Sequence, residues 1–386
     1  MTSRVNIRRT KKTRQQNPSS RSIQLLKQLW QTICNYIDAQ QQTASIELSP
    51  ADVSAIRTAS MYSHIPEQIR HIFESASHHR GIKTEIELKR GRKVAIYIAD
   101  PSSEFTDHYI RNSLTNIIAW LNYVSDISDD ASDIPICAQQ LNIYLLLTSA
   151  KKELPRNKAE LIDEIHANTA FTTACSTSND IYIYRREEWF KVFMHETFHC
   201  FGLDFSSSIG DDSTKRILSM FPALDKNTDV RLYETFCEMW AEIFHLCFCL
   251  FVSKDGKCRR FSERTFREAL HKEQVFSIIQ SNKLLHRSGI KYGDLVENNA
   301  KIYSENTPAF SYYVIKSMML WNIDAFLNWC VANNKTPIKF DQMNIAKYCD
   351  FVESLSKDVG YKRVVERMRN PLRTTLRMTA IDPKWN

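Results

Sequence analysis

The spacing of apolar residues divides the first hundred positions into two patterns. After a polar start, apolar side chains recur every three or four positions from Ile23 onward, which predicts an amphipathic helix. Ser49, followed by a proline and then an acid, is typical of a helix start, so a second helix is expected there. Residues 82–88 and 93–99 instead alternate between apolar and polar on either side of an Arg-Gly-Arg turn, which predicts a β-hairpin.

Helical periodicity dominates the rest of the chain, with two short strands before the main helices. The nearly unbroken apolar run 141–147 predicts a buried strand, and a shorter strand is expected at 181–184. A helix that begins at Arg186 should end at Gly202, because glycine readily adopts the left-handed conformation that closes helices. Further helices are expected at 105–124, 229–252, 262–286, 309–332, 341–355 and 361–369. This order predicts an α+β fold, with a small twisted sheet followed by a mostly helical part.

The same pattern divides the 386 residues into four regions. Residues 1–22 are a basic tail that is expected to be disordered, and residues 23–80 are an N-terminal helical region. Residues 81–204 hold the sheet and the helix that follows it. Residues 205–386, which begin with a polar loop of about 25 residues, are expected to form a helical subdomain that closes the cleft.

Charge and glycine content argue against two classes of binding protein. The formal net charge is +7, but residues 1–22 carry seven basic side chains and no acidic one, so acids and bases balance in the remainder. A neutral body lacks the basic face of a nucleic-acid-binding domain. The tail itself is expected to contact nucleic acid or an anionic surface, or to direct nuclear or organellar import. With 8 glycines and neither glycine-rich phosphate-loop motif, a nucleotide site is not expected.

Ten cysteines are scattered through the chain without a C-x-x-C pair. Cys237, Cys247, Cys249 and Cys330 lie in apolar stretches and are expected to be small buried side chains. This pattern predicts a reducing, intracellular environment such as the cytoplasm. The longest apolar run, 243–252, is too short to cross a bilayer, so no transmembrane segment is expected.

One motif carries specific chemistry: His195-Glu196-x-x-His199, in the helix that follows the sheet. Residues four apart share a helix face, so both imidazoles can reach one metal ion, and zinc accepts imidazole nitrogen. Glu196 lies about 100° around the helix from His195, beside the metal, where it can take a proton from water. The motif therefore predicts one Zn²⁺ per chain, with Glu196 as the general base.

A third protein ligand is expected, because catalytic zinc usually has three. Metzincins take it ten positions after the first histidine, but here that position is Phe205, and Asp204 comes one residue early. The other source is an apolar helix in the helical subdomain, whose acids Glu234, Glu238 and Glu242 recur every fourth residue on one face. Stacked carboxylates on such a helix repel one another unless a cation or hydrogen bonds compensate, so the ligand is expected among them.

These residues resemble the gluzincin branch of the zincin metallopeptidases, which includes thermolysin, neprilysin and anthrax lethal factor. The resemblance covers roughly residues 140–255 and rests on H-E-x-x-H followed by a helix that carries Glu, a small residue and a further acid. It implies a zincin-like fold with Glu234 as third ligand and Glu238 orienting a ligand histidine from behind. The alternative alignment makes Glu238 the ligand and gives Glu242 the orienting role. More loosely, the chain is similar to H-E-x-x-H proteins of large DNA viruses.

The resemblance implies two further elements of the site. An edge strand that precedes the metal-binding helix usually holds an extended peptide by main-chain hydrogen bonds, and residues 169–184 would take that role. A tyrosine or histidine usually donates a hydrogen bond to the oxyanion of the transition state. Tyr312 and Tyr313 are the candidates for that donor, as are Tyr233 and His286.

The sequence thus predicts a zinc-dependent metallopeptidase that acts on a peptide or protein substrate. The alternative is a non-catalytic interaction or structural protein that binds nucleic acid or an assembly through its tail and keeps a vestigial or structural metal site. Glu196 favours the enzyme, because a purely structural metal site does not use a general base.

Overall fold

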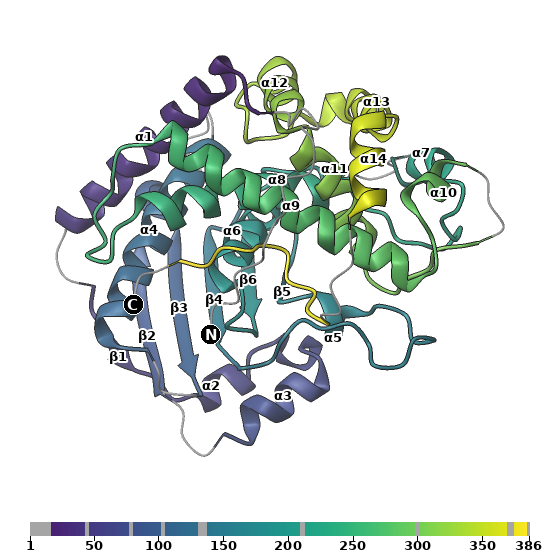
Figure 1. Ribbon diagram of the computed structural model, residues 1–386. Helices are drawn as coiled ribbons and strands as arrows, with labels where there is room; N and C mark the ends of the chain where they lie inside the picture. Colours follow the sequence, from purple (N-terminus) through teal and green to yellow (C-terminus); the bar gives the residue numbers. More distant parts are fainter. Residues whose placement is uncertain are drawn as a thin grey trace.

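The computed structural model describes residues 17–42, 46–76, 80–101, 105–129, 137–208, 213–297, 301–368 and 374–383. These residues form a six-stranded mixed sheet and a larger set of helices, which confirms the α+β class (Figure 1). The strands are β1 (Ser49–Pro50), β2 (Arg80–Glu87), β3 (Lys93–Asp100), β4 (Gln140–Leu146), β5 (Ala170–Thr172) and β6 (Ser178–Ile183). The longer helices are α1 (Ser20–Gln42), α3 (Glu67–Glu74), α4 (Asp107–Asp129), α6 (Trp189–Cys200), α7 (Ser213–Met220), α8 (Leu232–Phe251), α9 (Glu263–Arg287), α12 (Ile323–Asn333), α13 (Ile345–Ser356) and α14 (Val359–Arg367). The short ones include α2 (Ser54–Arg57), α5 (Glu164–Ala167), α10 (Tyr292–Val296), the π-helical turn η3 (Phe310–Ile315) and α11 (Lys316–Trp321).

The sheet has the strand order β1-β2-β3-β4-β6-β5, which places β5 at an edge. The predicted hairpin is confirmed, because β2 and β3 pair antiparallel with Ile86 opposite Val94. Strands β3, β4 and β6 run parallel, with Ile96, Ile143 and Ile181 aligned across them. Strand β5 pairs antiparallel with β6 and packs beside α6. The sheet therefore offers a short antiparallel edge next to the helix that carries the H-E-x-x-H motif.

The two faces of the sheet bury different side chains, because successive strand residues point to opposite faces. On one face, aliphatic side chains of β3, β4 and β6 join the main core with α1, α4, α6 and α8. On the other face, Tyr97, Tyr144, Tyr182 and Phe171 stack in register across four strands, with ring centroids 5.1, 4.6 and 5.0 Å apart. Helices α2 and α3 pack against this aromatic row. Helix α6 therefore lies on the face that belongs to the main core.

Helix α4 holds α6 in place at both of its ends. The indole nitrogen of Trp189, at the start of α6, donates to the hydroxyl of Tyr109 at 3.0 Å. Near the other end, the indole nitrogen of Trp120 donates to the hydroxyl of Thr197 at 2.8 Å. These bonds are buried, where an unpaired donor would be costly. They fix the rotation of α6, and with it the direction in which its histidines point.

The C-terminal segment 374–383 crosses over the region of α6 as an extended chain (Figure 1). The backbone N–H groups of Met378 and Thr379 donate to the buried carboxylate of Glu188 at 2.8 and 2.6 Å, directly before α6. Two further N–H groups of the segment donate to Glu273 of α9, at 2.8 and 3.0 Å. The segment is thus held by carboxylates that are themselves buried, and it forms part of the wall around the site described below.

Two local predictions are wrong. Ser49 and Pro50 do not begin a helix but form β1, opposite Lys83 and Ile82 at the edge of the sheet. An edge strand accommodates proline because one side of its backbone needs no partner. The polar segment 205–228, expected to be a loop, contains helix α7.

The predicted basic tail lies outside the described residues up to residue 16, and α1 begins at Ser20. Among the described helices, none combines the length and the apolar character that a membrane span requires.

Two disulfide bonds join Cys34 to Cys258 and Cys137 to Cys175. Neither pairing was predicted from the sequence, and the expectation of a reducing environment remains a prediction, although disulfides persist mainly in oxidising ones. Their partners lie 224 and 38 residues apart, and such pairings do not follow from sequence spacing. The four cysteines expected to be small buried side chains are free thiols, and Cys249 is the one of the four that is partly exposed.

Candidate metal centre

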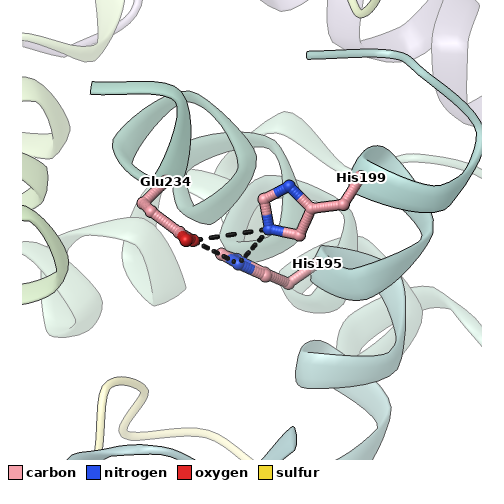
Figure 2. Close-up of side chains that lie close together, drawn as sticks. All are labelled: His195, His199 and Glu234. Atoms are coloured by element: carbon pink, nitrogen blue, oxygen red, sulfur yellow. Dashed lines mark hydrogen bonds and ion pairs between the residues drawn. The ribbon is translucent and has the colours of Figure 1, made fainter. Parts of the chain in front are cut away.

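Helix α6 is buried along its whole length and carries the H-E-x-x-H motif in its second half. Gly202, which closes the helix, has a φ of 63°, the left-handed conformation expected of a glycine there. A Cβ at this position would also lie 3.1 Å from the sulfur of Cys137. His195 and His199 lie one turn apart, and both point toward α8 (Figure 2).

Glu234, in the first turn of α8, meets both histidines (Figure 2). Its Oε2 lies 2.9 Å from Nε2 of His195 and 3.4 Å from Nε2 of His199. The two Nε2 atoms are 3.1 Å apart. All three side chains are buried, and together they could hold a metal ion.

The donor set fits zinc. A tetrahedral ion with bonds of about 2.0–2.1 Å keeps its ligand atoms about 3.3 Å apart. The three separations given above, 2.9, 3.1 and 3.4 Å, lie around that value. Two imidazoles and one carboxylate are also a donor set of catalytic zinc sites, which leave a fourth position for water or substrate.

Glu238 lies behind His195, on the side away from Glu234. Its Oε1 is 3.0 Å from Nδ1 of His195, and its other oxygen contacts the ammonium of Lys191. With Nδ1 facing this carboxylate, Nε2 of the same ring is left to face Glu234. Of the two alternatives left open by the sequence, the structure brings Glu234 to the two Nε2 atoms.

Glu242, one turn beyond Glu238 on α8, does not reach the histidines. Its carboxylate pairs with the ammonium of Lys316 at 2.8 Å, and both side chains are 1% exposed. The structure therefore gives Glu242 no orienting role at His195 or His199, because its position along α8 carries it past them.

Asp204 takes the orienting position at the second histidine. Its Oδ2 lies 2.6 Å from Nδ1 of His199, and its Oδ1 accepts a hydrogen bond from the hydroxyl of Ser206 at 2.9 Å. The left-handed turn at Gly202 reverses the chain, so the loop after α6 returns to the back of the imidazole. Sequence spacing weighed against Asp204 as a metzincin-type ligand, because it comes one residue early, but missed this role. The sequence feature that could have predicted this role is an acid shortly after the glycine that closes the helix.

The charges around the histidines favour a cation between them. Burial lowers the pKa of His195, but the hydrogen bond to Glu234 and the nearby carboxylate of Glu238 outweigh it and raise the pKa to about 9. Burial likewise opposes the charged form of His199, yet the neighbouring Cys237 and carboxylates raise its pKa well above the usual value. The pKa of Glu234 is lowered despite burial, first by the charge of His199. A metal ion therefore competes with protons for this position.

Glu196 faces a small cavity beside the histidines. The cavity has a volume of about 30 Å³, room for about two water molecules, and its lining includes Val192, His195, Glu196, Ala170 and Tyr312. No hydrogen bond or ion pair with another described residue holds the Glu196 carboxylate. Burial raises the pKa of this carboxyl, while the two histidines partly offset the effect. A carboxylate with a raised pKa next to room for water can act as a general base.

The two adjacent tyrosine candidates point in different directions. Tyr312 lines the cavity, with its ring centroid 6.2 Å from that of His195, and its pKa is raised by burial and by the charges of Glu234 and Glu196. Tyr313 does not line the cavity, because its hydroxyl donates to a backbone carbonyl of the C-terminal segment. Both lie in the π-helical turn η3, and such turns frequently mark functional sites.

The remaining oxyanion-donor candidates lie on α8 and α9. The ring centroid of Tyr233 is 5.9 Å from that of His199, so this tyrosine borders the metal centre, but it does not line the cavity that Glu196 faces. His286 lies in the last turn of α9 and is not part of this cavity either. Among the four candidates, Tyr312 is the one that shares the cavity with Glu196.

The edge strand β5 borders the same cavity. It is hydrogen-bonded within the sheet on one side only, and its first residue, Ala170, lines the cavity together with Thr169. The hydroxyl of Thr169 is buried and has no hydrogen-bond partner among the described residues. The edge of the sheet therefore brings both main-chain and side-chain polar groups to the candidate metal centre.

Comparisons with known proteins add no further assignment: no protein-family model, no curated protein and no solved structure matches this chain.

Proposed function

We propose that this protein is a zinc-dependent metallopeptidase of gluzincin-like architecture. The observation that carries the proposal is the convergence of His195, His199 and Glu234 on one point, with the carboxylate of Glu196 in the adjoining cavity and bonded to none of the described residues. A structural metal site needs the first three residues but not the fourth. An acid left without a protein partner beside a metal centre is the arrangement that hydrolysis requires.

A zinc ion held by these residues would supply a Lewis acid that polarises the attacked carbonyl and lowers the pKa of water. Glu196 takes a proton from the attacking water and later delivers it to the leaving amine. The hydroxyl of Tyr312 donates a hydrogen bond to the oxygen of the tetrahedral intermediate, where negative charge develops. Glu238 and Asp204 hold the two imidazoles in place throughout.

The substrate class follows from the edge strand. An extended peptide can add to β5 as a further antiparallel strand, because the outer side of β5 is unpaired within the sheet. The orphan hydroxyl of Thr169 is placed to bind a polar group of the same peptide. Main-chain pairing holds the scissile bond in reach of Glu196, which favours a peptide over a small ester or sugar.

The test measures zinc content and cleavage of a peptide library by wild type, Glu196→Gln and Glu268→Gln. Glu268 is an exposed glutamate on α9 and controls for the chemical change alone. We expect one zinc per chain in all three proteins, with cleavage by Glu196→Gln reduced about 100-fold or more. Wild-type protein that binds zinc but cleaves no peptide would contradict the proposal and favour an interaction protein.

A further inference from the structure

Helix α6 carries a lysine in its buried interior. Lys191 lies one turn before His195, and its side chain is 0% exposed. Taking an ammonium out of water is costly unless a negative partner compensates. The partners of Lys191 are the carboxylate of Glu238 and, at 3.8 Å, the sulfur of Met378 from the C-terminal segment.

The carboxylate of Glu238 joins two residues of α6. One oxygen contacts the ammonium of Lys191, and the other lies 3.0 Å from Nδ1 of His195. A glutamate side chain has several rotatable bonds, so one contact to His195 would not fix its position. The second contact, to a cation on the same rigid helix, holds the carboxylate where His195 needs it.

The other histidine is supported by a different pair of groups. The carboxylate of Asp204 contacts Nδ1 of His199 with one oxygen and accepts from the hydroxyl of Ser206 with the other. A hydroxyl is neutral, whereas an ammonium withdraws electron density from the carboxylate that it binds. The two imidazoles therefore have unequal charge behind them.

We propose that Lys191 is a positioning residue of the metal centre. Through Glu238 it fixes the orientation of His195 and makes this imidazole a weaker electron donor than His199. The inference rests on the proposed function only in requiring a metal ion at this site.

The test compares Lys191→Met with Lys316→Met in the full chain. Lys316 is 1% exposed and also pairs with a carboxylate of α8, but that carboxylate contacts neither histidine. We expect Lys191→Met to weaken zinc binding about 10- to 100-fold and to shift the visible absorption bands of bound Co²⁺. Lys316→Met should leave the Co²⁺ bands in place. Equal shifts in both variants, or no shift in Lys191→Met, would overturn the proposal.

The Lys191→Met variant leaves Glu238 buried without its cation, and a double variant replaces it in the test if it does not fold. Lys191→Met/Glu238→Gln removes both charges. Because Lys191 acts only through Glu238, the double variant should match the single Glu238→Gln variant in zinc affinity and Co²⁺ spectrum. A further loss in the double variant would show that Lys191 acts by another route, and the proposal would be wrong.

These measurements use no substrate, so they separate the two proposals. If wild type binds the metal and Lys191→Met has no effect, the positioning role is refuted and the peptidase proposal stands. If Lys191→Met changes the metal spectrum but wild type cleaves no peptide, the positioning role stands and the peptidase proposal is refuted.

Discussion

Replacing Asp204 with alanine tests the architecture of the metal centre most directly. In the structure this carboxylate lies 2.6 Å from Nδ1 of His199 and is 2% exposed. Sequence spacing alone leaves a competing view, in which an acid just after the glycine turn is itself a metal ligand. The two arrangements predict different losses of zinc affinity in the Asp204→Ala variant.

The structural arrangement predicts a moderate loss. Removing a group that orients a ligand histidine typically costs about 10- to 100-fold in metal affinity, which corresponds to roughly 1.4–2.7 kcal/mol. The contact is short, buried and charge-assisted, so the upper half of this range is expected. Asp204→Asn keeps an acceptor oxygen for the N–H of His199, and its loss should be about tenfold or less.

The assay is competition for zinc against a chromogenic chelator, with His199→Ala as the reference for a lost ligand. Thermal unfolding of the metal-free proteins shows whether a variant is folded before it is compared. An Asp204→Ala protein that binds zinc as weakly as His199→Ala would make Asp204 a ligand and refute the geometry. Affinity within about twofold of wild type would show that the contact does not support the histidine.

Three further predictions concern the protons, the oxyanion donor and the disulfides. Because the pKa of His195 is raised to about 9, zinc must displace a proton from this residue near neutral pH, so the apparent zinc affinity should increase as the pH is raised to about 9. Calorimetry in two buffers of different ionisation enthalpy measures the released proton, and the absence of proton release would contradict this prediction. Tyr312→Phe should lower kcat about 100-fold with little change in KM, whereas Tyr313→Phe should lower the melting temperature and spare kcat; the reverse result would exchange their roles. Removing the Cys137–Cys175 disulfide should lower the free energy of unfolding by about 4 kcal/mol, as measured in denaturant, and an unchanged midpoint would argue against the bond.

The sequence predicted the elements that depend on local pattern. The hairpin of β2 and β3 and the strand β4 follow from alternation and from a continuous apolar run, and both are present. The start of β1 was missed because Ser49-Pro50 satisfies the rules for a helix start, while the neighbouring edge of β2 decides its actual pairing. A partner distant in sequence overrides local preference in this way wherever it offers backbone hydrogen bonds.

At the candidate site, the sequence predicted residue types better than residue partners. The motif His195-Glu196-x-x-His199 needs only helical spacing, so its geometry could be read from the chain. Of the two Nδ1 partners, Glu238 followed from the family resemblance as one of two alternatives, whereas Asp204 did not, because it lies on a loop that turns back at Gly202.

The choice between Glu234 and Glu238 shows what information was missing. Glu234, Glu238 and Glu242 lie on one face of α8, so their spacing alone does not distinguish which of them is the metal ligand. Two of them, Glu238 and Glu242, have a buried lysine as partner, Lys191 and Lys316 respectively. Both lysines lie in apolar segments of the sequence, where burying an unpaired ammonium is costly. Each lysine therefore indicates that an acidic side chain is its partner in the folded protein.

Within the part of the chain that the structure describes, no lysine pairs with Glu234. The guanidinium of Arg231 lies 4.0 Å from its Oε1, but this arginine is already paired with Asp229. The other oxygen of Glu234 faces the two histidine nitrogens, so the remaining charge of the three acids is left for a cation held there. We therefore propose that two lysines and a metal ion balance the three carboxylates of this apolar helix, and that Glu234, which pairs with no lysine among the described residues, is the acid that would bind the metal.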